Sequence, residues 1–101
     1  MIIIAGEARI GEASLDAARE AARVMAEKST AEDGCHVYSF AEDLNEPGLF
    51  RIFEKWETQE ALDAHFQTPH MADFQAAMAT WDVQSVKATK YQIAAAEDMM
   101  S

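Results

Sequence analysis

Apolar and polar residues alternate along the chain with two different periods. Residues 2–9 begin with β-branched side chains and then alternate, a pattern that predicts a β-strand. From Leu15 onward, apolar residues return every three or four positions, which predicts an amphipathic helix. Ser14 precedes this helix and is expected to cap it. The helical pattern ends near Gly34, where neighbouring acidic residues indicate a turn.

Two further strands are predicted in the middle of the chain. Residues 35–40 and 49–57 are rich in β-branched and aromatic side chains. The segment between them is polar and contains Asn45, Pro47 and Gly48, which are typical turn residues. Because this segment is short, we expect the two strands to pair as a hairpin.

A broken helix is predicted after the hairpin. Thr58 is placed to cap a helix over residues 59–66. The pair Thr68-Pro69 interrupts this helix and starts another over residues 70–81, because proline is favoured at the first position of a helix. The second helical region is therefore expected to consist of two pieces.

The end of the chain completes a single domain over residues 1–96. Residues 83–96 predict a last strand, and residues 97–101 are expected to form a frayed tail. The order β-α-β-β-α-β is typical of the ferredoxin-like α+β fold, a four-stranded antiparallel sheet with helices on one face. We expect a ligand pocket between the sheet and these helices.

The predicted strands carry many apolar residues, while helices would cover only one face of the sheet. A second copy of the chain, packed sheet to sheet, would cover the other face. We therefore expect a homodimer through the open face. The apolar strand residues behind this expectation are Ile2, Ile4, Phe50, Ile52, Val83 and Val86.

Composition and charge restrict the possible partners. The 101 residues include 18 acidic and 8 basic side chains, giving a formal net charge of −10. Such a chain repels phosphate backbones and anionic lipid surfaces, so neither nucleic-acid nor membrane binding is expected. The N-terminal apolar run is short and has no basic leader, so a cytoplasmic location is the default expectation. Cys35 is the only cysteine, which excludes an internal disulfide, and it is expected to pack in the core.

Candidate chemistry concentrates at His65 and His70, which follow Trp56 in the chain. As metal ligands they would need a third partner, for which Asp73 and Glu54 are candidates; no metal site is expected, because nothing in the spacing selects either. As packing residues they would lie among the aromatic side chains of a core. As proton carriers they would exploit an imidazole pKa near neutrality.

The run of residues 34–74 resembles the antibiotic biosynthesis monooxygenase family, in particular its quinol-monooxygenase-like members. The residues that carry this resemblance are Gly34, Cys35, Tyr38, Glu54, Trp56, Ala61, Leu62, His65, His70 and Phe74. It implies a dimeric α+β barrel that oxidises a quinol or polyphenol with dioxygen and without flavin, haem or metal.

The same resemblance implies roles for individual side chains. His65 or His70 would be the catalytic base, and the other would orient the substrate or stabilise developing oxyanion charge. The substrate is expected to contact Tyr38, Glu54, Trp56 and Phe74.

The same residues bear on three other functions that proteins of this fold could have. The haem-degrading branch of the superfamily uses asparagine, tryptophan and histidine, whose positions fall here near Glu7 and on His65 and Gln75, so haem degradation is not expected. A non-catalytic dimeric module that binds a small hydrophobic ligand stays open as an alternative. So does an isomerase or lyase that uses the same pocket without oxygen.

Overall fold

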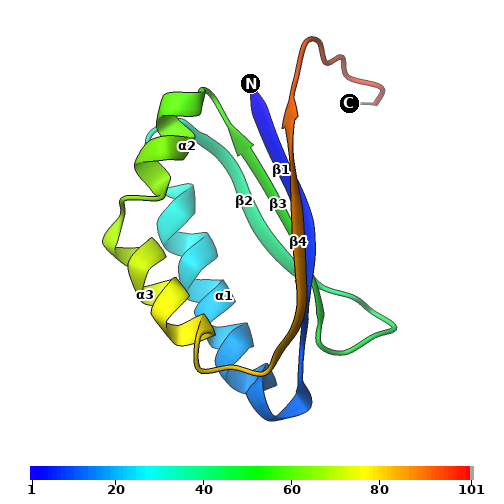
Figure 1. Cartoon of the computed structure of the whole chain (residues 1–101). Coiled ribbons are helices and arrows are strands. Elements are labelled where there is room, and N and C mark those ends of the chain that lie inside the picture. The colour runs from blue at the N-terminus through cyan, green and yellow to red at the C-terminus, as the bar shows by residue number, and fades with distance from the viewer. Residues whose placement is uncertain (101) are drawn as a thin grey trace.

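The computed structural model describes residues 1–100 as an antiparallel sheet with a layer of helices on one of its faces (Figure 1). The four strands lie in the order β2-β3-β1-β4. The elements are β1 (Ile2–Ile10), the 3₁₀ helix η1 (Glu12–Ser14), α1 (Leu15–Thr30), β2 (Cys35–Glu42), β3 (Leu49–Trp56), α2 (Gln59–His65), α3 (Pro69–Met78) and β4 (Val83–Gln92). The predicted ferredoxin-like α+β fold is confirmed.

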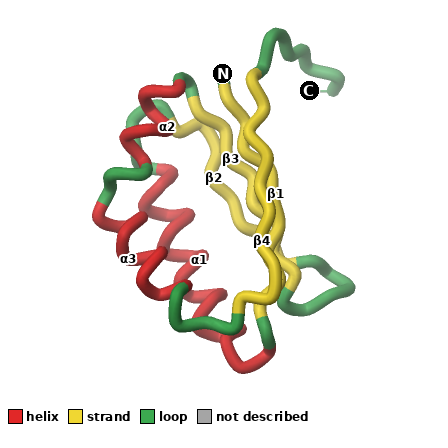
Figure 2. The backbone as a smooth tube through the Cα atoms, viewed as in Figure 1, coloured by secondary structure: helices red, strands yellow, loops and turns green. Residues whose placement is uncertain are grey.

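The helix layer is formed by α1 and α3, which lie side by side, with α2 above them at the end of the sheet where β3 finishes (Figure 2). Thr58 Oγ1 accepts a hydrogen bond from the Ala61 amide, and Thr68 Oγ1 accepts one from the Met71 amide. With Pro69 as the first residue of α3, both predicted helix starts are confirmed, because local side chains supply the missing backbone partners.

Several details at the ends of the elements differ from the prediction. Ser14 stands at the N-cap of α1, but its side chain makes no capping bond; its hydroxyl accepts the Asp82 amide instead. The last helix ends at Met78, and β4 ends at Gln92, so residues 93–96 lie outside the strand. Residues 97–100 form neither helix nor strand, and Ser101 lies outside the described residues.

Gly34 and Gly48 occupy the two turns that the sequence predicted. Their φ angles are 80° and 90°, in the left-handed region that side chains with a Cβ atom rarely adopt. A Cβ atom at Gly48 would also lie 2.6 Å from the carbonyl oxygen of Ile10. Both turns therefore depend on glycine.

The core lies between the sheet and the helices and has two clusters. Ile2, Met25, Tyr38, Trp56 and Leu62 form one, near α2. The other lies at the opposite end of α1 and consists of Ala8, Ile10, Ala18 and Phe50. Between them they join the helices to β1, β2 and β3.

The apolar strand residues that suggested an apolar open face point toward the helices instead. Ile2 and Ile4 belong to the first cluster or pack against it, and Phe50 and Val83 do the same in the second. Ile52 and Val86 line a cavity on this same side of the sheet. The sequence pattern did not show which strand face the helices cover, and these residues therefore do not account for an apolar open face.

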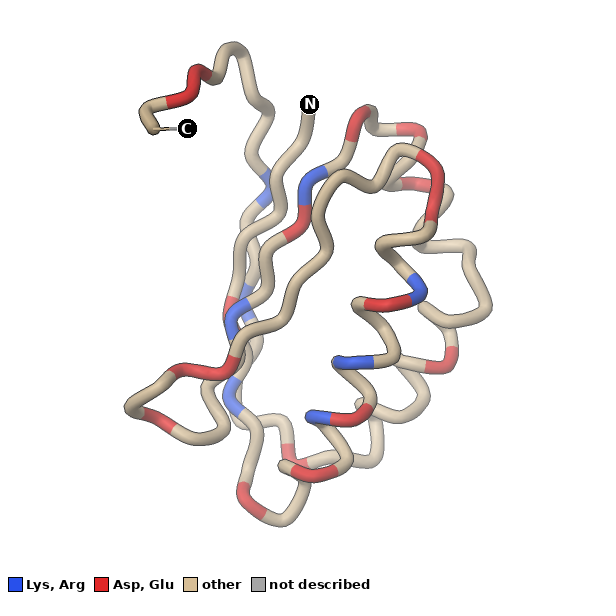
Figure 3. Tube along the Cα trace, turned by 180° about the vertical axis from the view of Figure 1, so that it is seen from behind, with Lys and Arg blue, Asp and Glu red and all other residues tan. Residues whose placement is uncertain are grey.

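The open face mixes apolar and charged side chains. Phe53 and Tyr91 on this face are exposed. Arg51 and Lys87 pair with Glu7 at 2.8 and 3.5 Å. Figure 3 shows charged residues of both signs along the strands and along α1. None of the helices described in residues 1–100 is long and apolar enough to cross a membrane.

Candidate functional site

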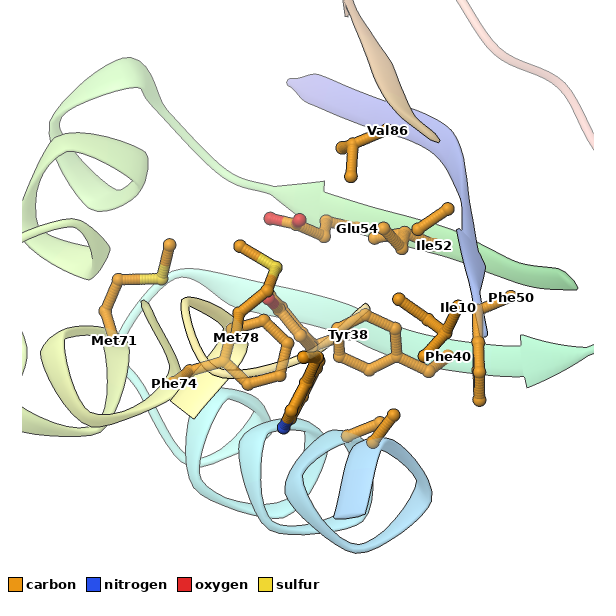
Figure 4. A pocket seen from close by; sticks show the side chains of 14 residues that line it. Ile10, Tyr38, Phe40, Phe50, Ile52, Glu54, Met71, Phe74, Met78 and Val86 are labelled. Atoms are coloured by element: carbon orange, nitrogen blue, oxygen red, sulfur yellow. The ribbon is translucent and has the colours of Figure 1, made fainter. Parts of the chain in front are cut away.

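A cavity of about 150 Å³ lies between the sheet and the helices (Figure 4). Its position matches the layer in which the sequence predicted a pocket. Its walls come from β1, β2, β3 and β4 on one side and from α1 and α3 on the other. The lining residues are Ala8, Ile10, Ala18, Ala22, Tyr38, Phe40, Phe50, Ile52, Glu54, Met71, Phe74, Met78, Trp81 and Val86. The wall is apolar except for the Glu54 carboxyl, the Tyr38 hydroxyl and the Trp81 indole.

Glu54 is the ionisable acid in this wall. It is only 8% exposed, and its carboxyl points from β3 toward the side of the cavity where Met71 and Met78 lie (Figure 4). The Trp56 indole N–H donates a hydrogen bond of 2.9 Å to Glu54 Oε1. Burial raises the pKa of Glu54, and the Trp56 hydrogen bond and the charge of His65 oppose that rise. The site thus holds a carboxyl whose proton affinity is raised and whose position is fixed.

Tyr38 is the cross-strand partner of Glu54 and contributes the phenol of the wall. Burial raises the pKa of this phenol, with further contributions from the charges of Glu54 and Glu32. Its ring lies edge-on to Phe40 and Trp56, with centroids 5.7 and 6.4 Å away. Tyr38 therefore stays protonated near neutral pH and can donate a hydrogen bond, whereas it cannot serve as a base.

His65 and His70 converge on a residue that the sequence analysis did not select. His65 Nδ1 and His70 Nε2 each lie 2.7 Å from the same oxygen, Glu32 Oε2. His65 is 1% exposed, and its ring packs 4.9 Å from Trp56 and 5.3 Å from Tyr38. Glu32 lies in the acidic segment between α1 and β2, which was predicted as a turn and given no functional role.

Neither histidine is among the residues that line the cavity. The structure therefore places both imidazoles outside the wall of this cavity. Their catalytic role stays a prediction. The break at Thr68-Pro69 redirects the chain, so that the first turn of α3 places His70 beside Glu32 rather than above the sheet.

The other predicted site residues, Phe74, Trp56 and Asp73, lie in three different positions relative to the cavity. Phe74 lines the cavity, stacked 5.8 Å from Phe40 and edge-on to Trp81. Trp56 is fully buried and does not line the cavity, but it holds Glu54. Asp73, considered as a metal ligand, lies with His70 along a different hollow beside α1.

Two further residues with reactive side chains, Cys35 and His36, lie outside the candidate site. Burial raises the pKa of the Cys35 thiol to about 11, helped by the charges of Glu32 and Glu54, so the thiolate is scarce near neutral pH. This agrees with the expected packing role. His36 is exposed and pairs with Glu57 at the surface.

Several wall residues were not identified from the sequence as ligand contacts. Met71, Met78, Trp81 and Phe40 were not selected as site residues, and Ile52 was expected on the open face of the sheet. Their positions in the cavity depend on how far α3 stands from the sheet, for which a single sequence has no signal.

Comparisons with known proteins give a consistent result. A Deinococcus radiodurans structure named for antibiotic biosynthesis monooxygenases is 29% identical, with a TM-score of 0.91 over 100% of both chains. The Pseudomonas aeruginosa protein PA3566 is 26% identical, with a TM-score of 0.83 over 92% of this chain and 94% of that one.

A curated relative and a family model extend the comparison to sequence. The uncharacterised Synechocystis protein sll1783 is 37% identical over 73 residues, which are 72% of this chain and 50% of that protein. The chain thus matches about half the length of this curated relative. The model of the antibiotic biosynthesis monooxygenase family matches residues 1–77. On this evidence the chain belongs to the antibiotic biosynthesis monooxygenase family.

Proposed function

We propose that this chain is a cofactor-independent monooxygenase that oxidises a quinol or polyphenol with dioxygen. The observation that carries the proposal is an apolar cavity with one buried carboxyl, Glu54, and one phenol donor, Tyr38, in its wall. Family membership supports the reaction class. An apolar space of about 150 Å³ accommodates one aromatic ring. A larger substrate would extend past Val86, which is 54% exposed at the edge of the cavity.

Glu54 is the general base of this proposal. Dioxygen is a triplet and reacts slowly with neutral phenols, whereas a phenolate can transfer one electron to it. Glu54 takes the phenolic proton, and its raised pKa brings its proton affinity closer to that of a phenol. Trp56 keeps the carboxylate oriented through its N–H donor. Tyr38 donates a hydrogen bond to the substrate oxygen as charge develops there.

The overall reaction balances without an external reductant. The phenolate gives one electron to dioxygen, and the resulting radical and superoxide combine to form a carbon–oxygen bond. Protonation gives a ring hydroperoxide, which loses the hydrogen of the same ring carbon together with hydroxide, so that a carbonyl and water form. Both electrons that reduce the second oxygen atom come from the substrate. A quinol with an unsubstituted ring carbon thus becomes a hydroxyquinone, with one water released.

His65 and His70 act as positioning residues in this proposal. The His65 ring packs against both Tyr38 and Trp56, so it supports the phenol donor and the residue that holds Glu54. Its hydrogen bond to Glu32, shared with His70, fixes the orientation of that ring. The proton-handling role that the family resemblance implied for the histidines passes to Glu54, since Glu54 is the ionisable residue in the cavity wall.

We also propose that the chain acts as a homodimer through the open sheet face. Strand β4 is an edge strand that pairs only with β1 in the described sheet, and it is exposed along nearly all of its length. Phe53 and Tyr91 provide apolar contacts on the open face. Exposed edge strands of this length are usually covered in folded proteins.

Oxygen uptake tests the enzymatic proposal. The purified chain is mixed with benzohydroquinone or naphthohydroquinone, and oxygen consumption is compared with that of buffer. Wild-type protein is expected to accelerate uptake, and Glu54→Gln should lower kcat by roughly 10²–10⁴-fold, the usual contribution of a general base. Glu57→Gln, which changes an exposed glutamate, serves as the matched control and should retain full activity. Binding of both quinols without any uptake would instead favour a non-catalytic binding module.

A further inference from the structure

Glu32, His65 and His70 form a cluster of metal-ligating side chains outside the cavity. Each offers one ligand atom, and the three atoms lie within 4.8 Å of one another. They come from three separate segments: the turn after α1, the end of α2 and the first turn of α3. We propose that this cluster binds a divalent transition-metal ion, with Zn²⁺ as the best match. No metal site was expected from the sequence, because nothing in the spacing selected Asp73 or Glu54 as a third ligand, and Glu32 was not considered.

The three ligand atoms are already close enough for a metal ion to be bound after local side-chain movement. Both imidazole nitrogens now lie 2.7 Å from Glu32 Oε2. Ligand atoms about 2.0–2.1 Å from a tetrahedral Zn²⁺ are separated from each other by roughly 3.3 Å. Glu32 therefore has to withdraw by roughly half an ångström, and the two imidazole nitrogens, which lie within 4.8 Å of each other, have to reach the same separation of roughly 3.3 Å. A turn residue can make that movement more easily than a helical one.

The charge around the cluster favours a cation. Among the described residues, the ion pairs of Glu32 are formed with the two histidines, and no lysine or arginine forms an ion pair with it. The charge of Glu32 also contributes to the raised pKa of Glu54, so the two carboxylates act on each other. The whole chain has a formal net charge of −10. A bound dication would compensate the charges of two neighbouring carboxylates, neither of which forms an ion pair with a lysine or arginine among the described residues.

The ligand set selects the type of ion. Two imidazole nitrogens and one carboxylate oxygen suit Zn²⁺, Co²⁺ and related ions, whereas Ca²⁺ and Mg²⁺ prefer sets made of oxygen. The Glu32 and His70 side chains keep 13% and 16% of their surface exposed, while His65 is buried. An ion can therefore enter from the side of Glu32 and His70, where water can complete its coordination.

The proposed metal site is distinct from the cavity. None of its three ligands lines the cavity, and the Tyr38 ring packs against His65 from the cavity wall. The ion would not touch a substrate there. Its effect would be to join the turn after α1 to α2 and α3, which stabilises the folded chain. The inference therefore goes beyond the proposed oxidation and does not depend on it.

Metal titration of the purified full chain tests this inference. After dialysis against EDTA, ZnCl₂ is added and binding is followed by calorimetry and by the thermal unfolding midpoint. One equivalent should bind, and a hundredfold excess over Kd should raise the midpoint by roughly 10 °C. CoCl₂ should produce the visible absorption of a protein-bound Co²⁺ ion. If wild-type protein shows no stoichiometric binding of either ion, the proposal is overturned.

Matched variants locate the site. His70→Gln and Glu32→Gln each remove one ligand, and each should weaken Zn²⁺ binding by at least roughly 10–100-fold. Having two such variants keeps the test decisive if one of them does not fold. His36→Gln, which alters the exposed His36–Glu57 pair, should bind Zn²⁺ like the wild type. Equal weakening in His36→Gln, or none in the ligand variants, would overturn the assignment. Oxygen uptake is measured separately, so failure of one proposal leaves the other to be judged by its own assay.

Discussion

Glu54 and Glu32 are two partly buried carboxylates in the same part of the molecule, and their surroundings differ in a way that separates their roles. Glu54 lies in an apolar wall, with one indole N–H as its hydrogen-bond donor. Glu32 lies in a turn, and one of its oxygens accepts from two imidazoles. His65 connects the two regions, because its ring packs on Tyr38 and Trp56 while its Nδ1 atom contacts Glu32.

The comparison shows how environment assigns chemistry to the same functional group. A carboxyl with few donors in an apolar space gains proton affinity, which suits it to take a proton from a bound ligand. A carboxylate that shares an oxygen with two imidazoles has the ligand set that a transition-metal ion requires. The cavity therefore carries the proposed reaction, and the histidine cluster carries the proposed metal site.

The largest expected effect on stability comes from removing the support of Glu54. Trp56→Phe deletes a fully buried indole and leaves a buried carboxyl without its donor. We expect the free energy of unfolding to fall by about 2–4 kcal/mol, from lost packing and an unsatisfied polar group. Chemical denaturation measures this. Trp81→Phe is the control, because Trp81 is only half-buried and its indole forms no comparable bond to a carboxyl; an equal loss there would contradict the role given to Trp56.

The pH dependence distinguishes Glu54 from an ordinary surface glutamate. Because burial raises its pKa, the acid limb of kcat/KM for quinol oxidation should lie above the ordinary value of 4.5. The folded state also holds this proton more tightly than the unfolded state. The stabilising contribution is therefore fully present below the unfolded pKa and is lost as pH rises through the folded pKa.

Two measurements check this dependence. A pH–rate profile gives the acid limb, and unfolding experiments from pH 4 upward compare wild type with Glu54→Gln. Their difference in stability should change in favour of the variant as pH rises. A limb at the ordinary glutamate pKa would show that Glu54 is not the base.

The smallest expected effect concerns the helix start that positions His70. Thr68→Ala removes the side-chain cap of α3 and should lower the free energy of unfolding by about 1 kcal/mol. It should also weaken Zn²⁺ binding slightly, because α3 begins beside the metal cluster, and should lower kcat for quinol oxidation far less than Glu54→Gln does. Thr80→Ala, at an exposed threonine that bonds only Ala77 O, is the control for thermal and calorimetric measurements. A large loss of oxidation with intact Zn²⁺ binding would reverse the assignment of the two regions.

Much of the fold was predictable because its signals are local. Thr58 and the pair Thr68-Pro69 act within one helical turn, and the structure confirms both starts. Ser14 shows the limit of such signals, since its hydroxyl bonds the Asp82 amide, 68 residues away. The apolar residues of β1, β3 and β4 were expected on the open face but lie on the face that the helices cover. The period of two separates the two faces of a strand without showing which one the helices cover.

In the candidate site, too, local features could be predicted and contacts between distant segments could not. Glu54 and Trp56 are two residues apart on one strand, so their shared face follows from strand geometry, whereas the hydrogen bond between them was not predicted. Phe74 and Tyr38 were selected through the family resemblance and line the cavity. Glu32 could not be selected, because its partners His65 and His70 are 33 and 38 positions away.

The sequence by itself determined the order of strands and helices, the family and the aromatic residues of the core, because each of these depends on neighbouring positions or on their periodicity. Only the tertiary structure decided that the histidines turn away from the cavity and meet Glu32, and that Glu54 is the ionisable group left in the wall. The physical reason is that contacts between distant segments depend on how the helices pack on the sheet, which sums many weak interactions along the whole chain.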